Sequence, residues 1–181
     1  MNLTEALNLL KRNDFIVESL MDEPIRECTE DEIAKCVALT YNESENKGLT
    51  DLSEIIARFK GYAEMYIDSS VLHAYTIDGN QCFILCKPRT SSDGNKIYKA
   101  KENYLSLAYV NPEARGTGVA AKLLKKCMQD SPNGLKLDTK YNNIAMIKLA
   151  KKLGFKTNED PKRHSYWITC SYKPNNKKRP K

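Results

Sequence analysis

Residues 104–139 carry strand and helix signals in an order that few folds can accommodate. Mostly apolar residues at 104–110, and apolar residues that alternate with polar ones at 135–139, predict two strands. Between them, a loop with Gly116 and Gly118 leads into a helix whose apolar residues recur at helical spacing. When a helix connects two strands in this way, the strands lie parallel and the connection is right-handed. The chain therefore needs a sheet with at least one parallel pair.

The remaining patterns indicate helices early in the chain and antiparallel strands after them. A helix is expected over residues 29–40, where Thr29 and Glu32 form a capping box, and a second over 52–66. Asp78-Gly79-Asn80 predicts a hairpin turn. The predicted fold class is α/β (α+β), with a mixed, mostly antiparallel central sheet and helices on both faces. The other expected elements are strands at 25–28, 71–77, 81–87, 155–158 and 165–172, a helix at 143–153, and a long loop or loose hairpin at 88–101.

The composition indicates one ordinary domain with a buried core. Of 181 residues, 41% are hydrophobic and 29% are charged, which excludes a wholly disordered chain, and the apolar runs are too short to span a membrane. The first residues lack the basic start and apolar block of a secretory signal, so we expect a soluble, cytoplasmic protein. The six cysteines show no metal-binding or C-x-x-C spacing and predict buried free thiols, with no metal site.

Charge is divided unequally along the chain. Residues 1–80 hold 7 Lys and Arg against 16 Asp and Glu, a net of −9, whereas residues 81–181 hold 22 against 7, a net of +15. Solvated charged surfaces explain this without any function. Two electrostatic tasks, one in each half, explain it equally well.

The loop after residues 104–110 has the features of an anion site. Gly116 and Gly118 let the backbone approach a ligand closely, and the free N–H groups at the start of the following helix attract a phosphate. Gly116-x-Gly118-x-x-Ala121, with Asp138 further on, also fits a dinucleotide fingerprint. However, five residues separate the strand from the first glycine, and too few residues follow Asp138 for a doubly wound sheet. No Gly-Lys-Ser/Thr follows the glycines, which excludes a nucleotide-triphosphate loop.

Two blocks of the sequence stand in the order and separation of a known family's motifs. The first is Arg115-x-x-Gly118-x-Ala120, preceded by a strand that ends in Val110-Asn-Pro-Glu. The second is a strand at 135–139, Asn143, a helix and the closing Leu153-Gly154-Phe155. Together they resemble the acetyl-CoA-binding core of the GNAT superfamily of N-acetyltransferases. Residues 25–33 also look like that family's first strand and helix.

The resemblance covers roughly residues 24–172 and divides the chain into three parts. Residues 1–23 form an N-terminal extension, with Leu3, Leu7 and Leu10 at the spacing of a short helix. Residues 24–172 form the N-acetyltransferase domain. Residues 173–181 are basic and contain proline, and we expect them to be a disordered tail.

The resemblance also implies which residues hold the cofactor, acetyl-CoA. The strand edge at Ala108, Tyr109 and Val110 would pair with the pantetheine arm, where the family has a bulge that splays the strands. A main-chain N–H near Val110 would polarise the thioester carbonyl, and Asn143 would hydrogen-bond an amide of the cofactor. The backbone amides expected to hold the pyrophosphate are those of Arg115, Gly116, Thr117, Gly118, Val119 and Ala120.

The usual acid and base of the family are both missing. Ala150 stands where many members have a tyrosine that protonates the leaving thiolate, and Ser106 stands where many have a glutamate base. Glu102, at the start of the same strand, is the nearest carboxylate, and Tyr104 and Ser106 are further catalytic candidates. Plain structural roles stay open for all three, as does catalysis by positioning, with solvent taking the protons.

The acidic half suggests the acceptor. Glu43, Glu45 and Glu54 lie in or beside the connection between the first two helices, which forms one wall of the acceptor site in the family. They would attract a cationic primary amine, such as a lysine side chain, a protein N-terminus, a polyamine or an aminoglycoside. The sequence thus predicts an enzyme that acetylates a primary amine by direct attack, as a monomer or homodimer without a membrane.

Two alternative functions stay open at this point. The chain could be a degenerate acyl-CoA-binding module without turnover, because the acid and base are missing. It could also act on a nucleic-acid-linked amine, guided by the basic half and by residues 177–181. For that tail, a contribution to solubility or a nuclear-import signal are further explanations.

Overall fold

A seven-stranded sheet forms the centre of the protein in the computed structural model, which describes residues 21–45, 48–67, 70–88, 90–93, 96–99, 101–158 and 167–174. Its strand order is β1-β2-β3-β6-β7-β9-β8. The strands are β1 (Arg26–Glu27), β2 (Val71–Thr76), β3 (Gln81–Cys86), β6 (Asn103–Val110), β7 (Leu135–Lys140), β8 (Lys156–Asn158) and β9 (Trp167–Tyr172). The helices are α2 (Glu30–Ser44), α3 (Leu52–Tyr66), α4 (Val119–Gln129), α5 (Ile144–Lys152) and a short 3-10 turn, η1 (Pro112–Ala114).

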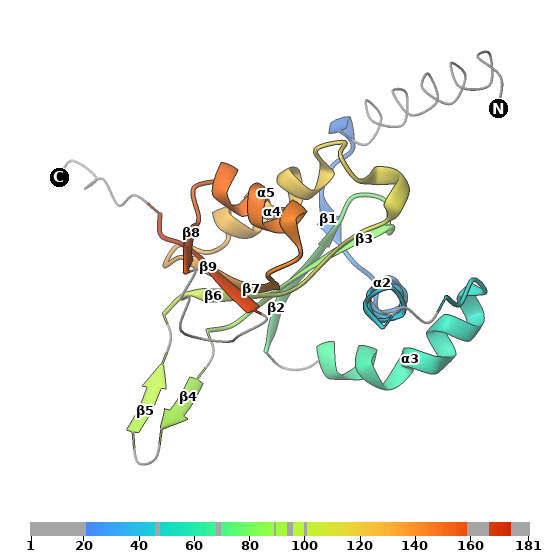
Figure 1. Ribbon diagram of the computed structural model, residues 1–181, viewed down its shortest axis with the longest axis horizontal. Helices are drawn as coiled ribbons and strands as arrows, with labels where there is room; N and C mark the ends of the chain where they lie inside the picture. Colours follow the sequence, from blue (N-terminus) through green and yellow to red (C-terminus); the bar gives the residue numbers. More distant parts are fainter. Residues whose placement is uncertain are drawn as a thin grey trace.

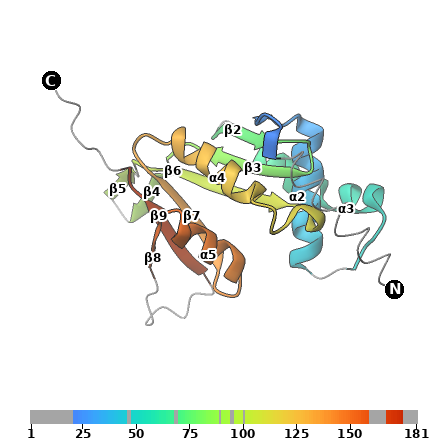
Figure 2. The ribbon, with the colours of Figure 1, turned by 90° about the horizontal axis from the view of Figure 1, so that it is seen from above.

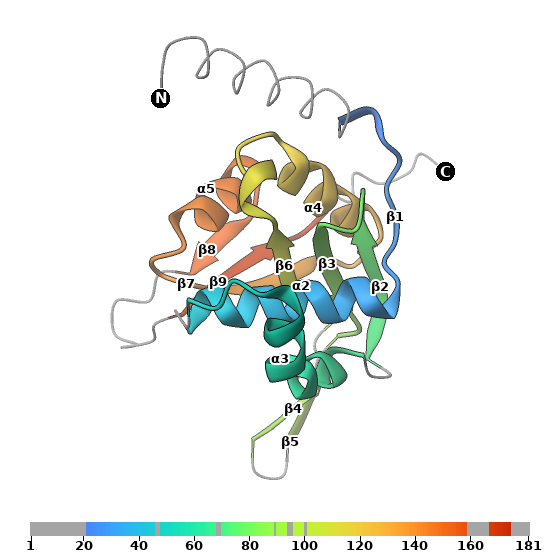
Figure 3. The same cartoon turned by 90° about the vertical axis from the view of Figure 1, so that its right-hand side faces the viewer.

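Helices cover both faces of the sheet. Helices α4 and α5 lie on one face, and α2 and α3 lie on the other (Figures 1 and 2). Helix α2 runs across the strands, and α3 packs on its outer side (Figure 3). Only β6 and β7 pair in parallel; the other pairs in this sheet are antiparallel. The predicted fold class and the predicted parallel crossover are therefore confirmed.

The loose hairpin expected between β3 and β6 is present as a separate two-stranded sheet. It consists of β4 (Thr90–Asp93) and β5 (Lys96–Lys99), which pair antiparallel. The hairpin projects away from the central sheet (Figure 1). The short helix predicted in the first dozen residues and the basic residues 175–181 lie outside the described part of the chain.

Helix α2 begins with the capping box that the sequence predicts. The Thr29 hydroxyl accepts from the Glu32 N–H, and the Glu32 carboxylate accepts from the Thr29 N–H. The same carboxylate accepts two hydrogen bonds from the Arg26 guanidinium, at 2.6 and 2.9 Å. The guanidinium and the Thr29 N–H lower the pKa of Glu32 to about 2, against a burial effect of opposite sign. Glu32 therefore ties β1 to the start of α2.

We expect Glu32 to make stability depend on pH in the acid range. Its folded-state pKa lies below the unfolded value of 4.5, so its contribution is fully present above pH 4.5 and is lost as the pH falls toward 2. Thermal melts of wild type and Glu32→Gln should differ clearly at pH 6 and converge near pH 2. Glu30→Gln, in the same helical turn, is the control. A wild-type advantage that stays constant from pH 6 to pH 2 would contradict this role.

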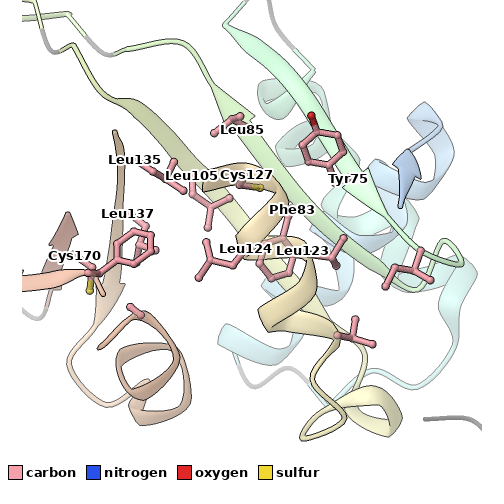
Figure 4. Close-up of a cluster of buried hydrophobic side chains, with 14 of the residues drawn as sticks. Tyr75, Phe83, Leu85, Leu105, Leu123, Leu124, Cys127, Leu135, Leu137 and Cys170 are labelled. Atoms are coloured by element: carbon pink, nitrogen blue, oxygen red, sulfur yellow. The ribbon is translucent and has the colours of Figure 1, made fainter. Parts of the chain in front are cut away.

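The main core lies between the sheet and the α4–α5 layer. Phe83, Leu123, Leu124 and Leu135 are all fully buried there (Figure 4). A second core, with Val37 and Ile84, lies between the sheet and α2. Burial of this kind contributes most of the stability of such a domain. All six cysteines are free thiols, as predicted, and five of them are buried.

A β-bulge at Ser106 changes which way the side chains of β6 face. Ile84 of β3 lies opposite Leu107, and the next residue, Leu85, lies opposite Leu105, so Ser106 is an extra residue. Leu105, before the bulge, packs into the core under α4 and α5, whereas Leu107, after it, packs into the core under α2. The bulge lies two residues before the strand edge where the resemblance led us to expect it.

The bulge coincides with a separation of β6 from β7. The two strands pair only between residues 103–105 and 135–137. After Leu105, β6 pairs with β3 alone, and after Leu137, β7 pairs with β9 alone, within the described residues. We call this gap the strand split and place its vertex at Ser106 and Asp138. An edge of β6 that faces the split has no partner strand.

Candidate active site

A cavity of about 440 Å³ opens at the strand split. Residues from six elements and from the β7–α5 connection surround it, so the site depends on the whole fold. On the α2–α3 side its walls include Tyr41, Tyr66 and Trp167, and on the α5 side they include Asn143 and Met146. The remaining lining residues are Thr40, Ser44, Leu105, Ser106, Leu107, Ala108, Leu137, Asp138, Thr139, Lys140 and Asn142. The split thus connects the two faces of the sheet.

The glycine loop lies at the end of β6. Gly116 and Gly118 have φ angles of 82° and 94°, a region that favours glycine. Gly118 is the N-cap of α4 and gives the helix no side-chain cap. The Val119 N–H donates to the Thr117 hydroxyl at 3.5 Å, and the other first-turn N–H groups of α4 need a partner from water or a ligand. A Cβ added at Gly116 would meet no atom within 4 Å, so the loop has open space in front of it.

Side chains in and beside the glycine loop hydrogen-bond within the loop or pack into the core, which leaves ligand binding to the backbone. Thr117 donates to the Ala114 carbonyl at 2.7 Å, Val119 is fully buried, and Tyr109 is buried in the core under α2. Burial, with the nearby Glu43 adding to it, raises the pKa of Tyr109 to about 12. Ala108 packs on the opposite side, toward the core under α4 and α5, and lines the cavity.

The segment before β1 lies against the start of α4. The Lys122 ammonium donates to the carbonyls of Met21 and Glu23 at 2.6 and 2.5 Å. A Cβ on Gly118 would lie 3.6 Å from the Met21 sulfur. Residues 21–23, assigned to an N-terminal extension by the sequence, are thus attached to the helix that begins at the glycine loop.

Arg115 joins the glycine loop to α2. Its guanidinium holds both carboxylate oxygens of Glu43, at 2.7 and 2.8 Å, and its Nε donates to the Val110 carbonyl at 3.0 Å. One guanidinium nitrogen makes both contacts to the carboxylate, and both side chains are about half exposed, so the pair contributes modestly to stability. Glu43, predicted to bind an acceptor, is therefore engaged by the loop that was predicted to hold the cofactor.

The three catalytic candidates, two in β6 and one just before it, differ in position. Ser106 lines the cavity, and its hydroxyl lies 3.3 Å from both the Ile84 carbonyl and the Cys86 sulfur. The Tyr104 hydroxyl donates to Asp138 at 3.1 Å. Glu102 lies outside the cavity lining and pairs with Lys136 at 3.5 Å.

Glu102 is poorly suited to act as a base near neutral pH. Burial opposes its ionisation, but main-chain N–H groups and Lys136 outweigh that effect and leave its pKa below the usual value. Glu102 also lies outside the cavity lining, so an acceptor bound in the cavity would be out of its reach. Its catalytic role stays a prediction without support from this geometry.

Sequence reasoning did not assign a catalytic role to Asp138. It lines the cavity at the vertex of the strand split and accepts hydrogen bonds from Tyr104 and Thr169. The only signal in the sequence is an acidic residue within a predicted strand. Asn143 also lines the cavity, and its side-chain oxygen caps α5 by accepting from the Met146 N–H at 3.2 Å.

The other predicted positions lie outside the cavity. Glu45 and Glu54 are exposed and are not part of its lining, so their predicted attraction of an acceptor would act over a longer range. Ala150 is fully buried in the core, at the position where many family members carry the acid. Among the described residues, no group of His, Cys, Asp or Glu could hold a metal ion, and no helix is long and apolar enough to cross a membrane.

Comparison with known families identifies the fold and its chemistry. Residues 61–155, which include the strand split, the glycine loop and Asn143, match the model of the acetyltransferase (GNAT) family. The chain belongs to the GNAT family of acetyltransferases. The cofactor of this family is acetyl-CoA. A search of curated proteins gave no significant match.

Solved structures share the GNAT fold at low sequence identity. PH1933 from Pyrococcus horikoshii is 16% identical with a TM-score of 0.57, and the match covers 85% of this chain and 99% of that one. Ribosomal-protein-alanine N-acetyltransferase from Brucella melitensis is 19% identical with a TM-score of 0.55, covering 83% and 99%. Arabidopsis thaliana NAA60, in complex with acetyl-CoA, is 11% identical with a TM-score of 0.51, covering 83% and 99%.

Proposed function

We propose that this GNAT protein transfers the acetyl group of acetyl-CoA directly to a primary amine. The observation that carries the proposal is the alignment of an uncapped helix start, a glycine loop and a strand split along one side of β6. Backbone N–H groups of residues 115–120 would hold the pyrophosphate, and the helix dipole of α4 favours negative charge there. The acceptor would enter from the α2–α3 face of the cavity.

The unpaired edge of β6 would align the pantetheine arm. An extended chain that carries amides can add to an exposed strand edge through main-chain hydrogen bonds. Ala108 lies on this edge between the glycine loop and the vertex, and Asn143 lies across the split. The bound arm would place its thioester near the vertex, within reach of an amine from the other face. Holding both reactants there would contribute much of the rate.

The acceptor is proposed to be cationic, since the half of the chain that supplies α2 and α3 is acidic. Clefts of one charge sign attract oppositely charged substrates over distances of several ångströms.

Free thiols at all six cysteines also fit a reducing compartment such as the cytoplasm. We do not assign a role to nucleic acid, because no described contact calls for it.

Turnover tests the proposed function. Acetyl-CoA is mixed with the protein and, in turn, a lysine peptide with a blocked N-terminus, a peptide with a free N-terminus, a polyamine and an aminoglycoside. Release of free thiol, together with a product that gains one acetyl group in mass spectrometry, is expected with at least one class. Tight binding of acetyl-CoA without turnover for any of them would instead support the acyl-CoA-binding module.

Long-range attraction of the acceptor is tested with Glu45→Gln/Glu54→Gln. The double variant leaves the Arg115–Glu43 pair intact and removes two exposed acidic charges. The KM of the acceptor should rise several-fold at low salt, and the difference should disappear at about 1 M salt, where the Debye length is only about 3 Å. Wild-type kinetics of the double variant at low salt would contradict the attraction. Glu43→Gln, measured separately, reports the loss of the Arg115 pair.

A further inference from the structure

Asp138 lies at the vertex of the strand split and lines the cavity. It is the first residue of β7 beyond the pairing with β6, and it shares the vertex of the strand split with Ser106. Its side chain is exposed and lines the cavity. Leu135 and Leu137, its neighbours in the alternation of β7, pack into the core on the opposite face. Asp138 therefore faces the α2–α3 side, from which an acceptor would approach.

Two hydroxyl groups hold the Asp138 carboxylate. The Thr169 hydroxyl donates to Oδ1 at 2.7 Å, and the Tyr104 hydroxyl donates to Oδ2 at 3.1 Å. Thr169 lies directly opposite Asp138 in the β7–β9 pair, so the sheet itself sets this geometry. Each carboxylate oxygen can accept more than one hydrogen bond, so the group can still receive one from a substrate.

The surroundings of Asp138 suit an amine that is carried by an aliphatic chain. Aromatic residues Tyr41, Tyr66 and Trp167 contribute to the cavity wall on this side. Tyr41 is held in place by a stacked contact with Tyr62, with ring centroids 4.2 Å apart. Aromatic faces attract cations and also pack against aliphatic chains. Two lysines share this face of β7 with Asp138: Lys140 lies two residues farther along the strand, and Lys136, two residues before it, pairs with Glu102.

We propose that Asp138 is the residue that binds the ammonium group of the acceptor and takes a proton from its nitrogen during the transfer. This inference rests on the proposed function. The bound ammonium first releases one proton to water. The amine then attacks the thioester carbon, a C–N bond forms and the C–S bond breaks. Asp138 accepts the second proton from nitrogen and then releases it to solvent, and the thiolate takes one proton from solvent. The products are the amide, free CoA and one net proton.

The test compares a charged with an uncharged nucleophile. Butylamine is a cation at neutral pH and needs both the ammonium site and the loss of protons, whereas hydroxylamine is uncharged and needs no ammonium site. In Asp138→Asn, kcat/KM for butylamine should fall about 100-fold or more, the usual effect of losing a general base. With hydroxylamine the loss should be less than about tenfold. Calorimetric binding of acetyl-CoA should be unchanged.

Asp130→Asn is a matched control. Asp130 also accepts from a tyrosine hydroxyl, that of Tyr75, and from a second donor, Lys126, but it lies at the end of α4, outside the cavity. This variant should lower the melting temperature and leave the kinetics with both nucleophiles unchanged. The control therefore distinguishes the effect of losing a Tyr–Asp hydrogen bond from the effect of losing the group that binds the substrate amine.

Each outcome has a distinct meaning. Equal activity of wild type and Asp138→Asn with butylamine would overturn the assignment of Asp138. So would an equal loss with both nucleophiles, or a wild-type protein that acetylates hydroxylamine but not butylamine. If wild type binds acetyl-CoA but acetylates neither nucleophile, the proposed function itself fails, and the inference fails with it.

Discussion

Deleting Ser106 is expected to abolish acetyl transfer while the fold persists. Ser106 is the extra residue of the bulge, so its removal restores regular alternation along β6. Tyr104 and Leu107 would both still face α2, and Leu105 and Ala108 would still face α4 and α5. Both cores therefore keep their residues. The deletion instead removes the local bend that a bulge introduces into a strand, at the point where β6 separates from β7.

Closure of the strand split would move the reacting groups out of position. A displacement of about 1 Å in an active site can cost about 100-fold in rate, and we expect at least that loss of turnover. Ser106→Ala is the matched control, because it keeps the bulge and removes only the hydroxyl. Circular dichroism and thermal melting establish that the deletion variant folds. Wild-type turnover in a folded deletion variant would contradict the role of the bulge, and inactivity of Ser106→Ala would make the hydroxyl catalytic.

Local signals predicted most of the fold. The capping box at Thr29 and Glu32 depends on residues three apart, and α3 covers the predicted residues 52–66. The glycine loop was also predictable, because Gly116 and Gly118 supply backbone angles that other residues rarely adopt.

Contacts between distant segments were not predictable from these patterns. Glu43 and Arg115 are 72 residues apart, and only the packing of α2 brings them together. Asp138 obtains its partners from two neighbouring strands, β6 and β9. The alternation of residues 104–110 contains no sign that Ser106 is an extra residue, because its effect depends on the register with β3. A site built from several strands thus requires the tertiary structure.

Gly118→Glu is expected to abolish binding of acetyl-CoA. The new carboxylate would sit at the N-cap of α4, where it can take the N–H groups predicted to hold the pyrophosphate, and it would repel the phosphates. Losing two charge-assisted hydrogen bonds of about 1.5–3 kcal/mol each weakens binding by more than about 100-fold. The variant also forces a side chain into a left-handed backbone conformation near Met21.

Gly154→Glu controls for strain and charge. Gly154 has φ 87°, close to that of Gly118, and a Cβ there would meet no atom within 4 Å. It follows α5 and lies outside the cavity lining. Both variants should lose about 1–2 kcal/mol of stability from the left-handed residue. Only Gly118→Glu should lose the cofactor. Equal binding by the two variants would contradict the assignment of the glycine loop.

The most direct test of the account is a calorimetric titration of the wild-type protein with acetyl-CoA, set beside one with acetyl-pantetheine, which lacks the pyrophosphate and nucleotide. We expect one site for acetyl-CoA and binding at least about 100-fold weaker for acetyl-pantetheine, because the glycine loop and the start of α4 would hold the phosphates. Equal affinity for the two would show that the glycine loop holds no phosphate. Absence of binding to acetyl-CoA would mean that the chain retains the GNAT fold without its cofactor site, and the proposed function would be wrong.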